Sequence, residues 1–262
     1  MKFWKKYAVR TIVLLTAMGT SLAIQAQTLK FMTYNLHHCA GMDKQLSEKR
    51  IAEVIAAERP DIVAVQELDS MTNRCPSYQL GEIAARLKMQ PVYAPSITFG
   101  GGKYGIGILT KQKPISVRSI PLPGKEPRVL LICEYEDYCV ANTHLALQES
   151  NRLQSLDIIV REAKRWDKPF LIAGDWNATP DSKFIRELSR YFWLLNNTDA
   201  FTYPAEQPNR CIDYIALYKG KKNVRVKKSY VVPEAIASDH RPVVVKIKLF
   251  NKKNHSRVIL RL

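Results

Sequence analysis

The stretch "PFLIAGDWNATPDS" at residues 169–182 ends an apolar run with side chains that can do chemistry. Four apolar residues lead into Gly174, and Asp175 and Asn177 follow it two positions apart. Side chains with that spacing point to the same side of an extended strand, so this acid and this amide would face one substrate. The stretch therefore predicts a polar site at the rim of a sheet.

Other apolar runs end with, contain or directly follow polar residues that a hydrophobic core does not need. They occur in the segments "TYNLHH", "DIVAVQEL", "NTHLAL", "CIDYIAL" and "SDHRPVVV". The polar side chains that they present are Asn35, Glu67, His144, Asp213, Asp239 and His240. Each residue alone has a structural explanation. An Asn at a strand end can cap a turn, and a buried Asp can pair with a basic residue. A single His can be a half-buried side chain whose hydrogen bonds are all made. Together they indicate a hard-cation site beside a histidine oriented by an aspartate.

Phosphodiester hydrolysis needs these residue types. It requires a nucleophilic water, a cation held by oxygen ligands, and donors that stabilise the charged transition state. Glu67 and Asp239 offer hard oxygen ligands for Mg²⁺, with Mn²⁺ or Ca²⁺ as alternatives, and Asn35 offers a neutral ligand. His240 would take a proton from water if a carboxylate such as Asp213 fixes its tautomer.

Strand-like and helix-like segments alternate along the chain. Short apolar runs bounded by turn residues predict strands over 28–36, 61–68, 104–111, 128–135, 138–145, 169–177, 210–219, 223–232 and 241–250. Helical periodicity predicts helices over 47–59, 80–89, 151–166 and 181–195, the first capped near Ser47 and stopped by Pro60. A tight turn after residue 135 makes an antiparallel hairpin, which a simple parallel sheet does not accommodate. Two mixed sheets packed face to face with helices outside fit better, in one domain or at most two.

Taken in order, a set of short motifs resembles the endonuclease/exonuclease/phosphatase superfamily. The motifs are "TYNLHH", "DIVAVQELD", "YGIGILTK", "NTHL", "GDWNATPDS", "IDYIAL" and "SDHRPVVV". That group includes pancreatic deoxyribonuclease, the abasic-site endonucleases, neutral sphingomyelinases and inositol polyphosphate 5-phosphatases. The resemblance covers nearly everything after residue 26. It implies a four-layer α/β sandwich and a metal-dependent hydrolase that acts on phosphoester bonds.

The resemblance also implies roles for the polar residues at the strand ends. Asn35, Glu67 and Asp239 look like the ligands of the divalent metal. His240, paired with Asp213, looks like the general base or the phosphate-binding histidine. The division of labour between these groups is left open by the sequence.

Three further residues match family positions around the reaction centre. Asp175 and Asn177 look like the residues that orient the water or the leaving group and stabilise the transition state. His144 matches a histidine of deoxyribonuclease-like and sphingomyelinase-like members. Abasic-site endonucleases typically carry a tyrosine in that region, so the chain departs from their pattern there.

Substrate contacts are expected from residues near the predicted site. Arg74 follows the Glu67 strand closely and can reach a phosphate, because arginine binds phosphate in bidentate fashion; an ordinary surface arginine is the alternative. "FGGGKYGIG" lacks the spacing of a nucleotide-binding loop, so we interpret it as a mobile loop that presents Tyr104. Arg128 in "KEPRVLL" is a similar candidate.

The composition bears on compartment and partner. Residues 1–26 are basic, then apolar, and end in a small residue, an order typical of a signal peptide; an uncleaved amphipathic anchor is the alternative. We therefore expect an exported protein, periplasmic or extracellular, with residues 27–262 as a monomeric catalytic domain. No second long apolar run suggests a membrane span in that remainder. A net charge of +16 favours polyanionic partners such as nucleic acid, although a solvated basic tail also accounts for part of it.

Five cysteines in an exported chain raise the question of disulfides, and an odd number leaves one unpaired. Cys39 and Cys75 each follow a predicted strand end, which makes them a candidate pair on one rim of a sheet. Cys133 and Cys139 flank the predicted hairpin turn, and Cys211 is expected to be buried and inert.

Three functions fit these features. A nuclease uses the positive charge, because neutralising backbone phosphates dominates non-specific affinity for nucleic acid. A sphingomyelinase-like or small-molecule phosphoesterase would use the same site, but no conspicuous apolar insertion for membrane contact is present. A non-catalytic binding module would have lost at least one site residue, whereas every matching position is filled. The sequence favours a phosphodiesterase, with nuclease first.

Overall fold

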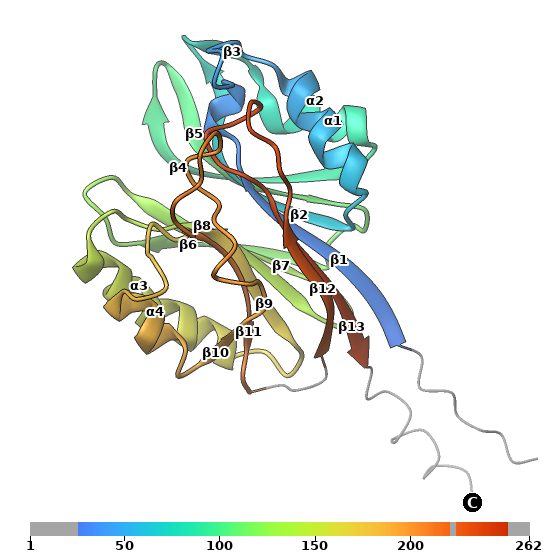
Figure 1. Cartoon of the computed structure of the whole chain (residues 1–262), viewed down its shortest axis with the longest axis vertical. Coiled ribbons are helices and arrows are strands. Elements are labelled where there is room, and N and C mark those ends of the chain that lie inside the picture. The colour runs from blue at the N-terminus through green and yellow to red at the C-terminus, as the bar shows by residue number, and fades with distance from the viewer. Residues whose placement is uncertain (1–25, 221–223, 251–262) are drawn as a thin grey trace, which may run out of the picture.

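Two mixed β-sheets pack face to face in the computed structural model, which describes residues 26–220 and 224–250 (Figure 1). The large sheet has the strand order β12 (Val224–Val231), β13 (Val243–Phe250), β1 (Ala26–Asn35), β2 (Ile62–Thr72), β5 (Gly102–Thr110) and β4 (Gln90–Phe99), with β3 (Cys75–Tyr78) paired to β2. The small sheet has the order β10 (Phe192–Leu194), β11 (Asp213–Tyr218), β9 (Phe170–Asp175), β8 (Cys139–His144), β7 (Arg128–Glu134) and β6 (Ser116–Leu122). The pairs β1–β2 and β8–β9 are parallel, and the other pairs in both sheets are antiparallel.

Helices cover the outer side of each sheet. The helices α1 (Glu48–Glu58) and α2 (Gln79–Leu87) pack on the large sheet, and α3 (Glu149–Lys164) and α4 (Lys183–Leu188) pack on the small one. The Ser47 hydroxyl accepts the Arg50 N–H, which caps α1 at the predicted residue. A single 3₁₀ turn, η1 (His37–Cys39), follows β1. No helix within the described part of the chain is long and apolar enough to cross a membrane.

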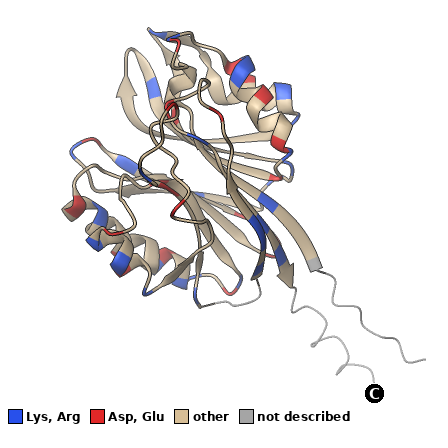
Figure 2. Cartoon of the chain, in the orientation of Figure 1, with Lys and Arg blue, Asp and Glu red and all other residues tan. Residues whose placement is uncertain are grey.

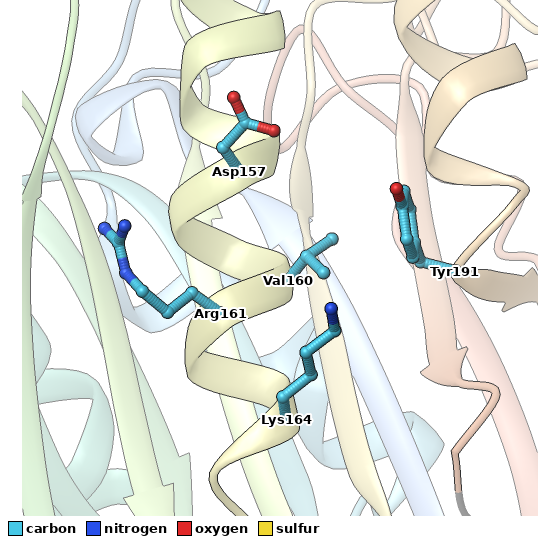
Figure 3. Close-up of a pocket in the computed structure, with 5 residues that line it drawn as sticks. All are labelled: Asp157, Val160, Arg161, Lys164 and Tyr191. Carbon is cyan, nitrogen blue, oxygen red and sulfur yellow. The ribbon is translucent and has the colours of Figure 1, made fainter.

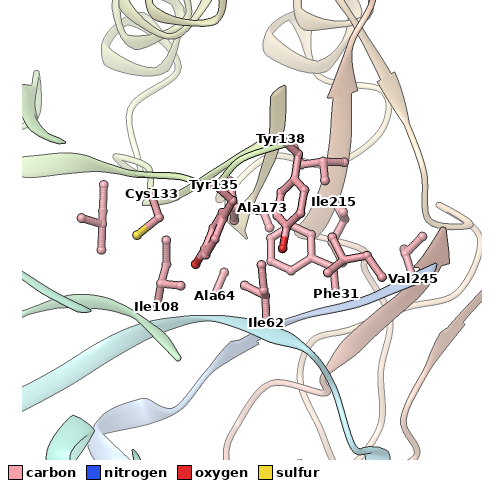
Figure 4. Close-up of a cluster of buried hydrophobic side chains, with 14 of the residues drawn as sticks. Phe31, Ile62, Ala64, Ile108, Cys133, Tyr135, Tyr138, Ala173, Ile215 and Val245 are labelled. Atoms are coloured by element: carbon pink, nitrogen blue, oxygen red, sulfur yellow. The ribbon is translucent and has the colours of Figure 1, made fainter. Parts of the chain in front are cut away.

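The main core lies between the two sheets (Figure 4). Phe31 and Ile62 from the large sheet meet Ala173 and Ile215 from the small sheet, and all four are fully buried. Two further apolar clusters lie between each sheet and its helices. The strand β9 is therefore buried on both faces, which explains its continuous apolar run. This arrangement of helices, two sheets and helices confirms the predicted four-layer α/β sandwich.

Two predictions about the chain were wrong. The predicted helix 181–195 ends at Leu188, and Phe192–Leu194 form the short strand β10 against β11. The periodicity of a short aromatic run fits either a helix or a strand. Here the run forms a strand because it pairs with the edge of β11. Cys39 and Cys75 are both buried but free, so the proposed disulfide is not formed.

Other segments also differ from expectation. The glycine-rich segment, interpreted above as a mobile loop, is a tight turn between β4 and β5 in which Gly100 and Gly101 adopt positive φ. Cys133, Cys139 and Cys211 are free and buried, and Cys211 precedes β11 instead of lying in it. The predicted signal peptide lies outside the described residues, apart from its last residue.

A buried amide joins the two sheets close to their shared rim. The Asn142 side chain of β8 donates from Nδ2 to the Val65 carbonyl at 2.8 Å and the Gly107 carbonyl at 2.7 Å. Its Oδ1 accepts the Gln66 Nε2–H at 2.8 Å. The ladder between β2 and β5 shifts register after Val65, so Asn142 satisfies carbonyls at the place where that pairing is interrupted.

Replacing this amide should destabilise the fold. In Asn142→Ala, two buried carbonyls and the Gln66 amide lose a partner, so we expect the free energy of unfolding to fall by about 3 kcal/mol. Urea denaturation followed by circular dichroism measures this change. The exposed Asn197→Ala should change the free energy of unfolding by less than about 0.5 kcal/mol. Equal effects of the two substitutions would contradict a special role for the contact between the sheets.

Candidate active site

Strand register aligns three of the predicted residues at the rim of the small sheet. In the parallel pair β8–β9, His144 lies opposite Asp175, and in the antiparallel pair β9–β11, Asp213 lies opposite Asp175. Ala173, two positions before Asp175, belongs to the core between the sheets, so these side chains face the large sheet. From that sheet, the Asn35 Nδ2 at the end of β1 donates to Asp175 Oδ2 at 3.0 Å. The predicted residues therefore meet between the two sheets.

A β-bulge turns Glu67 toward this meeting point. Val65 pairs with Gly107 and Leu68 with Gly105, so two residues of β2 stand opposite one of β5. Glu67 takes a φ of 59°, a left-handed conformation that is costly for a glutamate and typical of functional sites. Its Oε1 accepts the Asn35 Nδ2–H at 2.9 Å. The bulge thus brings the carboxylate of Glu67 to the end of β1.

Glu67 is held in its charged form. Burial opposes ionisation, but His144 and hydrogen bonds from Asn35 and Tyr104 favour the carboxylate and lower its pKa to about 2. Tyr104 is partly buried, and its pKa is raised by burial and by this carboxylate, so its hydroxyl remains a proton donor. Glu67 is therefore an anion at neutral pH, as a metal ligand must be.

His240 lies between two carboxylates. Its Nδ1 is 2.9 Å from Asp213 Oδ2, and its Nε2 is 3.6 Å from Asp175 Oδ2. The Thr202 hydroxyl donates to the same Asp213 oxygen at 2.6 Å and so fixes the carboxylate. Burial lowers the pKa of His240, but the charges of Asp213 and Asp175 outweigh burial and raise it to about 10. In the metal-free protein the ring is thus an imidazolium at neutral pH.

His144 is the neutral histidine of the site. Asn177 Nδ2 donates to the Leu145 carbonyl at 3.0 Å and lies 3.0 Å from His144 Nε2. Because an amide nitrogen only donates, this ring nitrogen must accept. Burial lowers the pKa of His144, Asp175 raises it, and Arg128 lowers it further. The two histidines therefore differ in charge at neutral pH.

Asn177 reaches the site by a different route from the one predicted. The strand ends at Asp175, so Asn177 does not lie on extended backbone; it has a left-handed φ of 49°. Its N–H donates to Asp175 Oδ1 at 2.9 Å, which fixes both the turn and the carboxylate. Asp175 is buried, and burial and Asp213 raise its pKa, whereas the two histidines lower it.

The loop before β13 brings Asp239 beside the end of β1. The Ser238 hydroxyl donates to the Asn35 carbonyl at 2.7 Å and so ties the loop to the strand. Asp239 Oδ1 lies 4.0 Å from His37 Nδ1. The Asn35 Oδ1 accepts the His37 N–H at 3.0 Å, which leaves its amide nitrogen facing Glu67. Asn35 thus orients Glu67, and Asp239 stands in the adjoining loop.

Two groups of side chains lie close enough to share a cation. Ligand atoms of Glu67, His144 and Asp175 lie within 4.8 Å of one another, and so do those of Asp175, Asp213 and His240. In the second group the imidazolium of His240 offsets the charge of one of the two carboxylates. The first contains two carboxylates and a neutral histidine, which fits a divalent cation.

The predicted substrate contacts lie at the border of the site. Arg74 donates from Nε to Asp69 Oδ2 at 2.6 Å and from Nη2 to Asp69 Oδ1 at 3.1 Å. Its guanidinium lies 4.6 Å from the ring centroid of Phe99 and 5.4 Å from that of Tyr104. Within the described residues, the Nη1 of Arg74 donates no hydrogen bond. Arg128 pairs with Glu126 and lies near enough to His144 for its charge to lower the pKa of that ring.

Sequence analysis missed supporting residues. Thr202 and Asn142 gave no signal, because each acts through a partner distant in the sequence. His38 was visible three residues after Asn35 but was given no role. It has a left-handed φ of 44°, and burial, Arg74 and His37 lower its pKa to about 4, so it is neutral.

A separate hollow on the small-sheet side contains none of these residues (Figure 3). It has a volume of about 330 Å³ and is lined by Asp157, Val160, Arg161, Lys164 and Tyr191. Four of the five residues lie on α3, at the outer layer of the fold. The hollow is therefore distinct from the candidate active site.

The charge state of His240 can be tested directly. We expect Asp213→Asn to lower the pKa of His240 from about 10 toward the ordinary value, because it removes the largest favourable charge. Because the folded pKa lies above the unfolded value of about 6.5, the charged ring stabilises the fold fully below that pH. That stability is lost as the pH rises through about 10.

Proton NMR titration of the metal-free protein measures the pKa of His240 in both forms. The exposed Asp157→Asn serves as the control and should leave the pKa unchanged. A pKa near 6.5 already in the unsubstituted protein would contradict the charge assignment.

The sequence of this chain matches a family of known proteins. Residues 32–240 match the Endonuclease/Exonuclease/phosphatase family. A DNA-(apurinic or apyrimidinic site) endonuclease from Dictyostelium discoideum is 27% identical over 176 residues, which are 59% of this chain and 43% of that relative. The match therefore spans less than half the length of that relative.

Solved structures share the fold. An endonuclease/exonuclease/phosphatase from Beutenbergia cavernae superposes with a TM-score of 0.72 at 21% identity, covering 86% of this chain and 72% of that chain. A mannosyl-6-phosphatase from Bacteroides thetaiotaomicron superposes with a TM-score of 0.67 at 17% identity, covering 84% of this chain and 99% of that chain. At these identities the likeness concerns the fold alone.

Proposed function

Because this chain belongs to the endonuclease/exonuclease/phosphatase family, we propose that it is a divalent-metal-dependent phosphodiesterase acting on nucleic acid. Members of the family hydrolyse phosphoester bonds with the help of a divalent metal. One observation carries the proposal for this chain. Polar side chains from both sheets form a single connected group, from Glu67 through Asn35 and Asp175 to His240.

The residues fit a Mg²⁺-like cation beside Glu67. Glu67 would hold it from the large sheet, with Asp175 from the small sheet and Asn35 and Asp239 at its border. When bound, such a cation supplies positive charge to a phosphoryl oxygen and favours the attack of water. Mn²⁺ or Ca²⁺ would take the same oxygen ligands.

The two histidines would act in different ways. His240 is already protonated in the metal-free protein, so it is suited to donate a hydrogen bond from Nε2 to a phosphate oxygen. A general base must be unprotonated, so the charged His240 is not suited to that role; Asp175, the buried carboxylate beside it, would orient the attacking water next to the cation. The neutral His144, held in place by the Asn177 amide, would orient the substrate from the other side.

Nucleic acid is the substrate class that the charge favours. The net charge of +16 supports binding of a polyanion. The Dictyostelium relative is a DNA endonuclease. At the border of the site, Arg74 has Nη1 available for a second phosphate. The mannosyl-6-phosphatase shares the fold, so a small phosphoester is the alternative. Export by residues 1–26 remains part of the proposal.

Activity assays test the assignment of the site. We expect Mg²⁺- or Mn²⁺-dependent nicking of plasmid DNA that stops when the metal is chelated. Glu67→Gln and His240→Gln should lower the rate by at least about 10³-fold, because each removes an electrostatic contribution to the transition state. The surface substitution Glu187→Gln is the control and should keep the rate.

Assays on several substrates test the assignment of the site separately from the assignment of its substrate. Hydrolysis of bis-p-nitrophenyl phosphate, mannose 6-phosphate or sphingomyelin without plasmid nicking would keep the site and reject the nuclease. Activity that survives in Glu67→Gln and His240→Gln, with thermal unfolding unchanged, would reject the catalytic assignment itself.

Arg74 should affect polymeric substrates more than small ones. We expect Arg74→Ala to raise KM for DNA by about tenfold, since a charge-assisted bond to a second phosphate is lost. Lysine should not replace it, because the planar guanidinium is held by Asp69 and stacked on Phe99. Steady-state kinetics on DNA and on bis-p-nitrophenyl phosphate measure the difference, with the exposed Arg86→Ala as control. An equal loss on both substrates would contradict a role in binding the second phosphate.

A further inference from the structure

Basic side chains stand opposite one another across three neighbouring strands of the large sheet. In the register of β1, β13 and β12, Lys30 lies opposite Lys246, and Lys246 lies opposite Lys228. In the next row, Lys248 lies opposite Arg225. We call these five residues the basic face. Figure 2 shows lysine and arginine gathered on these strands.

The basic face lies on the outer side of the sheet. On β13, Ile247 and Leu249 belong to the core between the sheets, so Lys246 and Lys248 point the other way. Val244, on the same side as these lysines, packs in the cluster under α1 and α2. The two helices therefore cover one part of this side and leave the basic face open.

The charges of the basic face are mostly unpaired. Glu58, at the end of α1, binds Lys30 Nζ at 2.8 Å. Across residues 26–220 and 224–250, no carboxylate forms an ion pair with Arg225, Lys228, Lys246 or Lys248. Like charges directly opposite each other destabilise a sheet, so the fold itself gains nothing from this arrangement.

The basic face is separate from the candidate active site. Lys30 is five residues from Asn35 along β1, a distance of about 17 Å at the rise of a strand. Lys248 lies opposite Thr28, which is about 23 Å from Asn35 by the same measure. A nucleic acid held here would have to run about five to seven base pairs along the molecule before it reached the site.

We propose that the basic face docks the protein on an anionic lipid surface. Two rows of cations spread over three strands make a two-dimensional array, which matches a plane of anionic headgroups. Aromatic rings lie among the charges: Lys228 Nζ is 4.7 Å from the ring centroid of Tyr230, and Lys248 Nζ is 5.5 Å from that of Phe250. Aromatic side chains beside lysines are typical of the interface between membrane and water.

The positions of the chain ends support the same partner. Ala26 pairs with Phe250, so both ends of the described fold lie beside the basic face. The sequence after Phe250 contains Lys252, Lys253, Arg257 and Arg261. A segment of this composition favours anionic lipid, so it would add to the attraction.

Vesicle binding tests the proposal with the full chain. Affinity is measured by flotation with vesicles of phosphatidylcholine alone and with vesicles that also contain phosphatidylglycerol. We expect a preference for the anionic vesicles that weakens with salt. The triple variant Lys228→Glu, Lys246→Glu, Lys248→Glu should lose that preference, with affinity falling on the order of a hundredfold.

A matched control carries the same change in net charge elsewhere. Lys88→Glu, Lys113→Glu, Lys164→Glu reverses three exposed lysines outside the basic face and should keep the preference for anionic vesicles. Both triple variants should hydrolyse bis-p-nitrophenyl phosphate at the unsubstituted rate, which shows that they are folded. Equal loss of vesicle binding in both would overturn the proposal. The proposal would also be overturned if the variant Lys228→Glu, Lys246→Glu, Lys248→Glu lost binding to duplex DNA but kept its binding to vesicles.

Discussion

The contact between Gln66 and Asn142 is the constraint on which the site depends. It is a single hydrogen bond between two buried amides, but it joins the two sheets next to the residues of the candidate active site. Gln66 precedes Glu67, and Asn142 lies two positions before His144 on the same side of its strand. The same amide of Asn142 satisfies the carbonyls at the β2 bulge. If the sheets separated here, Glu67 and Asp175 would no longer lie within reach of one cation.

The charges of the site are stable because each has a partner. Burying a carboxylate is costly unless hydrogen bonds or opposite charge compensate it. Asp213 has His240 and Thr202, Glu67 has Asn35, and Asp175 lies near both histidines. This arrangement leaves His240 charged and His144 neutral, although both rings are buried. Pairs of groups whose pKa values are pushed apart in this way are typical of acid–base sites.

The apolar runs predicted the strands that carry the site, because β1, β2, β8, β9 and β11 are largely buried; β1, β8 and β9 end at the rim, β11 begins there, and β2 passes it at Glu67. The edge strands β4 and β6 were not predicted, since they are half exposed and contain Pro95 and Pro121. The candidate residues at the strand ends were identified from their types. Their charge states were not, because the pKa of His240 depends on carboxylates 27 and 65 positions away. The bulge at Glu67 was also invisible, since it is set by pairing with β5.

The central claim is that the two sheets together hold a divalent cation beside Glu67. The most direct measurement is a crystal structure of the protein soaked in Mn²⁺, with data collected at a wavelength where manganese scatters anomalously. We predict an anomalous peak bonded to a Glu67 carboxylate oxygen, between the ends of β1 and β9. A peak held only by other residues, or none at the rim of the two sheets at a concentration that supports activity, would contradict it.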